Sequence, residues 1–171
     1  GVAPDSVGSS EVFESAQSDY VSAVFDSTNN KVVAYYADIG NNSYPTGVVG
    51  TVSGTSISFG TPVVLRSLSV APLGNIVFDS NVNRVVFSCG GFGVNAFADS
   101  AQVSGTTLAN ITGTNWVFNP ASTYDLTSTF DSNSNKIVFA YRDNGNSNSG
   151  TAVVGSLASN GDFSFGSEVV F

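Results

Sequence analysis

The chain repeats one pattern about every 52 residues. The tripeptide Phe-Asp-Ser begins at residues 25, 78 and 130, so successive copies are 53 and 52 residues apart. Each tripeptide is followed at the same distance by an Asn and a basic residue, so three of the five basic residues occupy a single repeat position. These three are Lys31, Arg84 and Lys136. A regular period of this length indicates one supersecondary unit that is copied along the chain.

The end of each copy is marked by a glycine five residues before an apolar residue. This spacing occurs at residues 60–65, 113–118 and 166–171. We therefore divide the chain into repeat 1 (14–65), repeat 2 (66–118) and repeat 3 (119–171), of which repeat 2 is diverged. The same spacing at residues 8–13 predicts that residues 1–13 hold the trailing strand of a preceding repeat. Because no Met begins the chain, we also expect it to be a segment of a longer polypeptide.

Each copy contains four segments with the composition of strands. In repeat 1 they are residues 20–25, 31–37, 46–52 and 56–65, and with the leading strand the chain totals thirteen. The loop after the first strand is rich in Asp and Asn, whose side chains bond their own backbone and tolerate the left-handed conformations of hairpin turns. We interpret the tripeptide aspartates as structural turn residues rather than catalytic or metal-binding carboxylates, and expect the basic residues to pair with them across the hairpin. These aspartates are Asp26, Asp79 and Asp131.

The composition favours an all-β protein and excludes several functions. Eighteen glycines and only 11% charged residues are typical of short strands joined by tight turns. The net charge of −8 repels a phosphate backbone, so we expect no nucleic-acid partner. The apolar runs are far shorter than the roughly 20 residues that a helix needs to insert into a membrane, so we expect no membrane insertion. One Cys and no His exclude an internal disulfide, the ordinary zinc sites and the His-based catalytic triads. Without an activating base, Cys89 is expected to be a small buried residue.

Four-stranded units that repeat near 50 residues are typical of β-propeller blades, which is the architecture we predict. A usual propeller has about four to eight blades, so three copies would form a partial array, or two chains would pair into a six-bladed ring. The alternative is a compact three-fold domain, a β-trefoil or a β-prism. A partial array leaves strand edges at residues 8–13 and 168–171. Since exposed edges pair with other strands, we expect self-association or contact with neighbouring repeats of a longer chain.

Several motifs resemble a known kind of repeat. Repeat 1 contains Tyr-x-Asp-x-Gly-Asn at residues 36–41, Val-Gly-Thr-Val-Ser-Gly-Thr at 49–55 and Phe-Gly-Thr-Pro-Val-Val at 59–64, in addition to Phe-Asp-Ser and Asn-Lys. Together these motifs resemble the tandem propeller-like repeats of marine phage virion proteins and large secreted bacterial proteins, and the likeness extends over nearly the whole chain. The resemblance implies a tail, fibre or capsid-surface component, or an extracellular adhesin.

Two loops collect the hard oxygen ligands that calcium prefers. They contribute Asp38 and Asn41 in repeat 1, and Asp143 and Asn146 in repeat 3. Their spacing matches neither an EF-hand nor a glycine-rich nonapeptide repeat. A turn without metal is therefore favoured, and calcium is the one cofactor that we retain as a candidate.

Three tyrosines are the candidates for stacking on the sugar rings of a glycan, namely Tyr20, Tyr44 and Tyr124. Tyr44, in a loop beside Pro45, is predicted to be the most exposed of them. Trp116 aligns with valines of the sister copies, which favours a core or inter-sheet position instead.

The leading functional hypothesis is a non-enzymatic structural or surface component of a virion or an extracellular assembly. It places the chain outside the cell or on the surface of a virus particle. One alternative is a lectin-like module that binds a cell-surface glycan or receptor. A less favoured alternative is a propeller glycosidase, for which no segment singles out the required pair of carboxylates.

Overall fold

The computed structural model of this chain describes residues 7–68, 73–112 and 116–171. They form three antiparallel sheets, one from each third of the chain. The first sheet consists of β1 (Ser18–Asp26), β2 (Lys31–Asp38), β3 (Tyr44–Ser53), β4 (Ser56–Phe59) and β5 (Val63–Val64). The second sheet consists of β6 (Leu73–Asp79), β7 (Arg84–Gly91), β8 (Val94–Ser104), β9 (Thr107–Thr112) and β10 (Val117–Asn119). The third sheet consists of β11 (Thr123–Asp131), β12 (Lys136–Asp143), β13 (Ser149–Leu157), β14 (Phe163–Phe165) and β15 (Val169–Val170). The predicted all-β class and the three sheets of similar strand order are thus confirmed.

Every sheet is a meander in which the chain adds one strand after another. In the first sheet the order is β1-β2-β3-β4, and β5 pairs with β3 as well. β4 pairs with the end of β3 and β5 with its beginning, at Thr46 and Gly47, so β4 and β5 together make one interrupted outer strand. The same interruption separates β9 from β10 along β8, and β14 from β15 along β13. None of the three sheets closes on itself within the described residues.

The strand count differs from the sequence-based prediction. The part of the chain that the structure describes contains fifteen strands rather than thirteen, since each predicted fourth strand is divided into two. The leading strand expected at residues 8–13 is absent, because residues 7–17 belong to no strand. A strand needs a hydrogen-bonding partner along its edge, and residues 7–17 pair with none of the strand edges that the structure describes.

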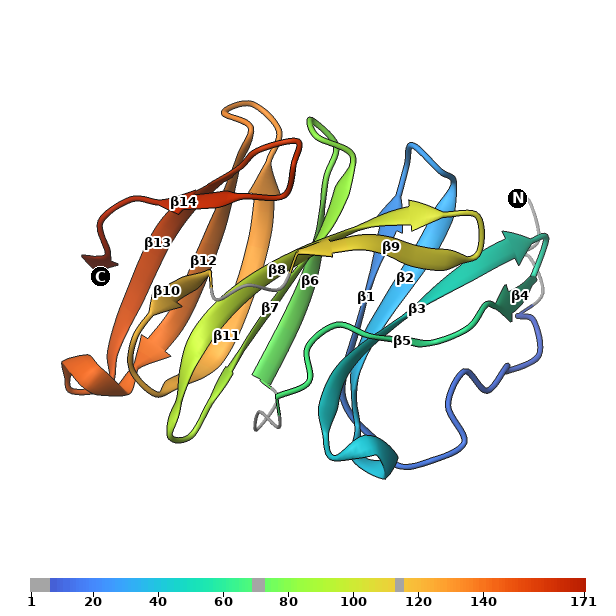
Figure 1. The fold of residues 1–171 in the computed structure, drawn as a ribbon, viewed down its shortest axis with the longest axis horizontal. Coiled ribbons are helices and arrows are strands. Elements are labelled where there is room, and N and C mark those ends of the chain that lie inside the picture. Colours follow the sequence, from blue (N-terminus) through green and yellow to red (C-terminus); the bar gives the residue numbers. More distant parts are fainter. Residues whose placement is uncertain (1–6, 69–72, 113–115) are drawn as a thin grey trace, which may run out of the picture.

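The sheets stack face to face in chain order, with β6 lying against both β1 and β11 (Figure 1). Val33, Tyr35 and Val49 of the first sheet pack with Phe78 and Phe87 of the second. A second core joins the other pair of sheets, and it includes Val77, Val86, Ala98, Phe118, Ile137, Phe139 and Val153.

Burial along equivalent strands reports the position of each sheet in the stack. β7, in the middle sheet, is buried at every residue, whereas β12 alternates between buried and more exposed residues. Alternation with a period of two is typical of a strand with one face packed and one face free. The third sheet therefore has a free face on the side away from the second sheet.

A polar ladder joins the first strands of the three sheets. Ser22 Oγ donates to Asn75 Oδ1 (3.0 Å), and Asn75 Nδ2 donates to Thr127 Oγ1 (3.0 Å). These three residues occupy one repeat position, 53 and 52 residues apart. Because each hydrogen bond crosses from one sheet to the next, the ladder sets the register of the stack.

No helix of the described residues is long and apolar enough to cross a membrane.

Candidate functional site

The first sheet exposes a position that is part of the core elsewhere in the molecule. Phe25, Phe78 and Phe130 share one repeat position. Phe78 is 9% exposed and packs between the first and second sheets, and Phe130 packs against the core between the second and third sheets. Phe25 is 54% exposed. The outward side of the first sheet is thus built like a buried sheet face but remains partly open.

The neighbours of Phe25 on this side are also apolar. Cross-strand partners point to the same face of a sheet. One row of such partners runs across the four strands β1 to β4 and consists of Phe25, Val32, Gly50 and Phe59. The same register places further side chains on this face. We call this surface the open face, and it comprises Ala23, Phe25, Val32, Ala34, Tyr36, Val48, Val52, Phe59 and Val64. Of these, Phe25, Val52 and Val64 are exposed, whereas Ala34, Tyr36 and Val48 are buried. Apolar sheet faces of this kind mark interaction surfaces.

Phe13 covers one part of the open face. Its ring centroid lies 5.1 Å from that of Tyr36 and 5.5 Å from that of Phe59. Phe118, which closes repeat 2, lies 5.6 Å from the equivalent Tyr141 and 5.9 Å from Phe165 in the third sheet. Phe13 therefore packs on the first sheet as the last residue of repeat 2 packs on the third.

Gly8 reproduces the other end of the same arrangement. An ideal Cβ on Gly8 would lie 1.7 Å from the carbonyl oxygen of Thr55, in the turn between β3 and β4. An ideal Cβ on Gly60 would lie 1.8 Å from the carbonyl oxygen of Thr106, in the turn between β8 and β9. Both glycines allow the chain to approach the backbone of the following sheet closely. Residues 8–13 thus lie on the first sheet as the trailing residues of one repeat lie on the next, although they form no strand.

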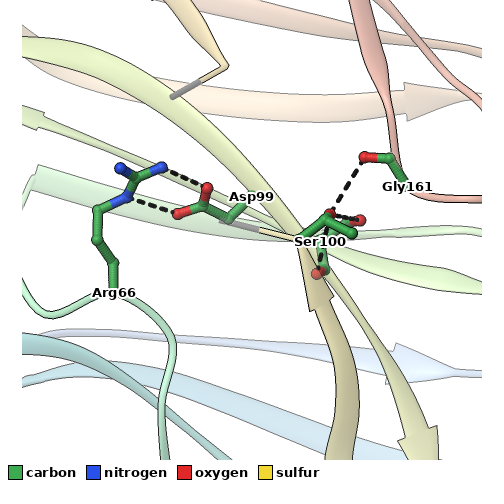
Figure 2. A network of polar contacts seen from close by, with 5 residues as sticks. Arg66, Asp99, Ser100 and Gly161 are labelled. Atoms are coloured by element: carbon green, nitrogen blue, oxygen red, sulfur yellow. Dashed lines mark hydrogen bonds and ion pairs between the residues drawn. The ribbon is translucent and has the colours of Figure 1, made fainter. Parts of the chain in front are cut away.

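An ion pair is buried where the chain passes from the first sheet to the second. The Arg66 side chain lies alongside Asp99 of β8, with Nη2 2.5 Å from Oδ1 and Nε 2.9 Å from Oδ2 (Figure 2). The guanidinium also lies 4.4 Å from the ring centroid of Phe97. Burial raises the pKa of the Asp99 carboxyl, and the hydrogen bond and charge of Arg66 oppose this rise. The pair therefore fastens the connecting segment to the second sheet.

A second polar network joins the second sheet to the third. Ser100 and Thr112 share a hydrogen bond (2.8 Å), and Thr112 Oγ1 donates to the carbonyl oxygen of Gly161 (3.1 Å). Arg84 Nε donates to Ser100 Oγ (2.9 Å), and Arg84 Nη2 donates to Asn110 O (2.6 Å). Since the loop with Gly161 belongs to repeat 3, the bond from Thr112 to Gly161 crosses the inter-sheet boundary, and the other three bonds fix the strands of the second sheet to one another.

The repeated basic residues do not pair with the repeated aspartates, which corrects the sequence-based expectation. Lys31 Nζ donates to Thr51 Oγ1 and Lys136 Nζ to Ser156 Oγ, each at 2.8 Å. Arg84 likewise reaches a hydroxyl, that of Ser100. All three cations thus bond to the third strand of their own sheet, because the tripeptide aspartates are already occupied by the turn.

The tripeptide aspartates accept hydrogen bonds from the backbone of their hairpins. Asp26 Oδ1 accepts from the amides of Thr28 and Asn29 (both 2.9 Å). Asp79 Oδ1 accepts from the amide of Asn81, and Asp131 Oδ1 from that of Asn133, again at 2.9 Å. Burial raises the pKa of Asp79, whereas hydrogen bonds from Ser134 and Asn133 lower that of the exposed Asp131.

The candidate calcium residues lie in two separate loops. Asp38 precedes the short 3-10 helix η1 (Ile39–Asn41) and accepts from the Asn41 amide at 3.1 Å. Asp143 precedes η2 (Asn144–Asn146), and its Oδ1 accepts from the Gly145 amide (2.8 Å) and from Asn119 Nδ2 (3.1 Å). The two aspartates therefore cap turns in the first and third sheets. Residues 7–68, 73–112 and 116–171 contain no group of three or more His, Cys, Asp or Glu side chains suited to a metal.

The three candidate glycan-binding tyrosines lie on three different strands. Tyr20, at a bulge in β1, is 48% exposed, whereas Tyr44 is the partly buried first residue of β3 and pairs with Asp38. The prediction that Tyr44 is the most exposed of the three is therefore wrong. Tyr124 lies on β11, and the guanidinium of Arg142, on β12, lies 4.6 Å from its ring centroid. Trp116 is partly buried and packs against the core between the second and third sheets.

Cys89 is buried in β7, and its burial raises the pKa of its thiol to about 12. A thiol with such a pKa stays protonated near neutral pH, and the thiolate is the nucleophilic form.

Comparison with known protein families, curated proteins and solved structures found no match for this chain.

The open face was missed by sequence reasoning, although a signal for it was present. The alignment of Phe25 with Phe78 and Phe130 shows equivalent residues in three sheets. Among the described residues no sheet packs on this side of the first sheet, so its copy of this position is exposed. The sequence identifies the position, and the direction of stacking, which only the structure gives, decides which of the three copies is exposed.

Proposed function

We propose that this chain is a non-enzymatic structural module of an extracellular or virion-surface assembly, in which its open face packs against another sheet of the same kind. The exposure of Phe25, at a position where Phe78 is buried, is the observation that carries the proposal. Burying an apolar side chain of this size is favourable by roughly 1.5–3 kcal/mol. A chain that leaves such a row open gains stability from a further sheet.

At the level of the fold, we propose that the three sheets are consecutive blades of a partial β-propeller. Three features support this: the meander order of the strands, the face-to-face stacking, and the adjacency of the first strands β1, β6 and β11. Propeller blades are four-stranded sheets arranged around a central channel. The ladder from Ser22 through Asn75 to Thr127 would then run around the inner side of the array.

The use of the charged side chains supports a structural role rather than catalysis. The tripeptide aspartates bind turn amides, Asp99 binds Arg66, and Arg84 connects two sheets through its bond to the carbonyl oxygen of Ser159 (3.3 Å). A hollow of about 260 Å³ beside the turn between β13 and β14 has Asp162 as the single carboxylate among its lining residues, and Asp162 accepts from Asn160 Nδ2 at 2.7 Å. Glycoside hydrolysis uses two carboxylates.

The setting outside a cell or on a virion follows from the resemblance of the motifs to tandem propeller-like repeats of phage virion and secreted bacterial proteins. The net charge of −8 agrees with it, because a strongly charged surface keeps such modules apart except at their docking faces.

A four-repeat chain tests the proposal. A second copy of residues 119–171 is fused directly before residue 14, so that Phe171 is followed by Glu14 just as Phe118 is followed by Asn119. We expect the added sheet to cover Phe25, so that Phe25→Ala then destabilises the chain by about 3–5 kcal/mol. The free energy of unfolding is measured by urea denaturation. A small loss, or separate unfolding of the added repeat, would contradict the proposal.

The glycan-binding alternative makes a different prediction. It is supported if the chain binds an immobilised glycan and if Tyr20→Ser abolishes this binding while Phe25→Ser does not. Glycan-array measurements on both variants distinguish the two functions.

A further inference from the structure

We propose that residues 8–13 are an exchangeable cap of the open face, and that residues 166–171 of a second copy of this chain take the same place and join the copies head to tail. This inference rests on the proposed function, because it names the partner of the open face. The first observation that supports it is Gly166, because a single copy of the chain does not require glycine at this position.

Gly166 occupies the repeat position of Gly8 and Gly60. At Gly8 and Gly60 an added Cβ would collide with a carbonyl oxygen of the following sheet, at 1.7 and 1.8 Å. At Gly166 the nearest atom to such a Cβ is the carbonyl oxygen of Val154, at an ordinary 3.6 Å, and the backbone is outside the left-handed region. Glycine is therefore required at this position only when a following sheet brings its turn against it.

Phe171 likewise lacks the partners that its repeat position has elsewhere. Phe118 is 5% exposed because it packs on Tyr141 and Phe165. Phe171 is 80% exposed. The open face of a second copy offers the equivalent pair of rings, Tyr36 and Phe59, which Phe13 occupies in the single chain.

The free face of the third sheet carries side chains that the other sheets use to pack on their successors. Val33, Val86 and Val138 share one repeat position, and the first two are fully buried while Val138 is only partly buried. On β13, Val154 is 45% exposed, whereas the equivalent Val49 on β3 is fully buried. The third sheet of one copy is therefore equipped to pack on the first sheet of another.

The cap is held without strand pairing. Residues 7–17 belong to no strand, and Phe13 packs on Tyr36 and Phe59, while the bonds of Glu14 to the Tyr36 hydroxyl (3.2 Å) and of Gln17 O to the Ile39 amide (3.1 Å) lie just beyond the cap. In contrast, the segment 166–171 pairs with β13 through Val169 and Val170. Docking of a second copy adds the packing of a whole sheet to the contacts of its trailing segment, which favours exchange.

Exchange has a consequence for assembly. The cap and the segment 166–171 of a second copy need the same place, so docking requires the cap to leave. A head-to-tail contact generates a ring if its rotation closes and an open filament if it does not. Two copies would contribute six sheets, within the range of about four to eight blades of known propellers.

The experiment compares the self-association of capped and uncapped chains by sedimentation velocity over a series of concentrations. We expect Phe13→Ser to strengthen self-association at least about tenfold, which corresponds to about 1.4 kcal/mol. The control is Phe92→Ser, which removes an exposed Phe from the turn between β7 and β8 and should leave the association unchanged.

Two double variants test whether the association uses the segment 166–171. Gly166→Ala is tolerated in the single chain, because the added Cβ has 3.6 Å of clearance, but in the docked state it would collide with Thr55 as at Gly8. We expect Phe13→Ser/Gly166→Ala and Phe13→Ser/Phe171→Ser to return to the wild-type level of association with little change in thermal stability. Association that persists in both would overturn the proposal.

A folded Phe13→Ser chain that stays monomeric would also overturn it. If Phe13→Ser loses its fold, Gly8→Ala replaces it, because its Cβ would collide with the carbonyl oxygen of Thr55 and so displace the cap, and a folded but monomeric Gly8→Ala chain counts in the same way. Burial of Phe25 in the four-repeat chain together with a monomeric uncapped chain would refute the exchange and leave the proposed function intact. If Phe25 stays exposed in the four-repeat chain and the uncapped chain stays monomeric, both the proposed function and the exchange are refuted.

Discussion

At the scale of single residues, the inter-sheet boundaries depend on side chains that break the repeat. Tyr35 of β2 reaches across to β6, where an ideal Cβ on Gly74 would lie 2.3 Å from its ring and its hydroxyl oxygen. Asp99 replaces the valines found at the equivalent places of the other sheets, Val48 and Val153, and binds Arg66. The boundary between the first and second sheets is thereby made specific.

Gly74→Ala tests the close approach of Tyr35. The added methyl group overlaps the ring, so Tyr35 or β6 must shift, and overpacking of this kind is expected to lower the free energy of unfolding by about 1–3 kcal/mol. The matched control is Gly166→Ala, whose Cβ meets no atom closer than 3.6 Å and should have little effect. Urea denaturation measures both, and equal losses would show that the approach of Tyr35 is not what requires glycine at residue 74.

Arg66→Met tests the buried ion pair. It leaves the Asp99 carboxylate buried without its cation, and a loss of about 3–5 kcal/mol is expected near neutral pH. In this variant burial still raises the folded-state pKa of Asp99 above the unfolded value near 3.8, so the folded state takes up a proton more readily. The loss should therefore shrink as the pH falls toward that value.

The double variant Arg66→Met/Asp99→Leu removes both charges and should recover most of the stability. Urea denaturation of the single and double variants over a range of pH makes the comparison. A double variant that is no more stable than Arg66→Met would argue against an uncompensated charge as the cause of the loss.

At the scale of elements, each first hairpin is organised by one aspartate and one left-handed asparagine. Asn30, Asn83 and Asn135 have φ values of 53°, 54° and 55°. Asn tolerates this conformation better than most residues with a side chain. The hairpins are therefore determined locally, which explains why their pattern survives even in the diverged repeat 2.

The hairpins differ in burial, which leads to a prediction. Asp26 is almost fully buried and also accepts from Asn29 Nδ2 (2.8 Å), whereas Asp131 is exposed. Asp26→Ala leaves turn amides without a partner in a buried setting and should lower the free energy of unfolding by about 1–3 kcal/mol. Asp131→Ala should cause a smaller loss, because water replaces its carboxylate. Thermal denaturation of the two variants makes the comparison, and a larger loss for Asp131→Ala would contradict this account.

At the scale of the whole molecule, position in the stack decides what an identical residue contributes. Phe78→Ala removes a side chain from the core between two sheets and should lower the free energy of unfolding by about 3–5 kcal/mol. Phe25→Ala, at the same repeat position on the open face, should lower it by less than about 1 kcal/mol. Chemical denaturation of both variants distinguishes the two, and equal losses would mean that the open face is covered in solution.

Local features of the sequence were sufficient to predict the all-β class, the three units and the strands that precede and follow the first hairpins. Strand alternation and Asp-Asn turns depend on residues that are close in the chain, so each repeat by itself contains the sequence features that predict its strands and hairpin. The interruption of each fourth strand and the absence of a strand at residues 8–13 were not predictable in this way, because a strand exists only where an edge offers hydrogen bonds.

Only the tertiary structure decided which copy of a repeated residue is buried and which is free. Phe25, Phe78 and Phe130 are identical in the sequence, yet the stacking direction leaves Phe25 exposed. It also decided the pairing of Arg66 with Asp99, 33 residues apart and specific to one boundary. The physical reason is that burial and ion pairing depend on what lies across a sheet face, and the spacing of residues along one chain contains no record of it.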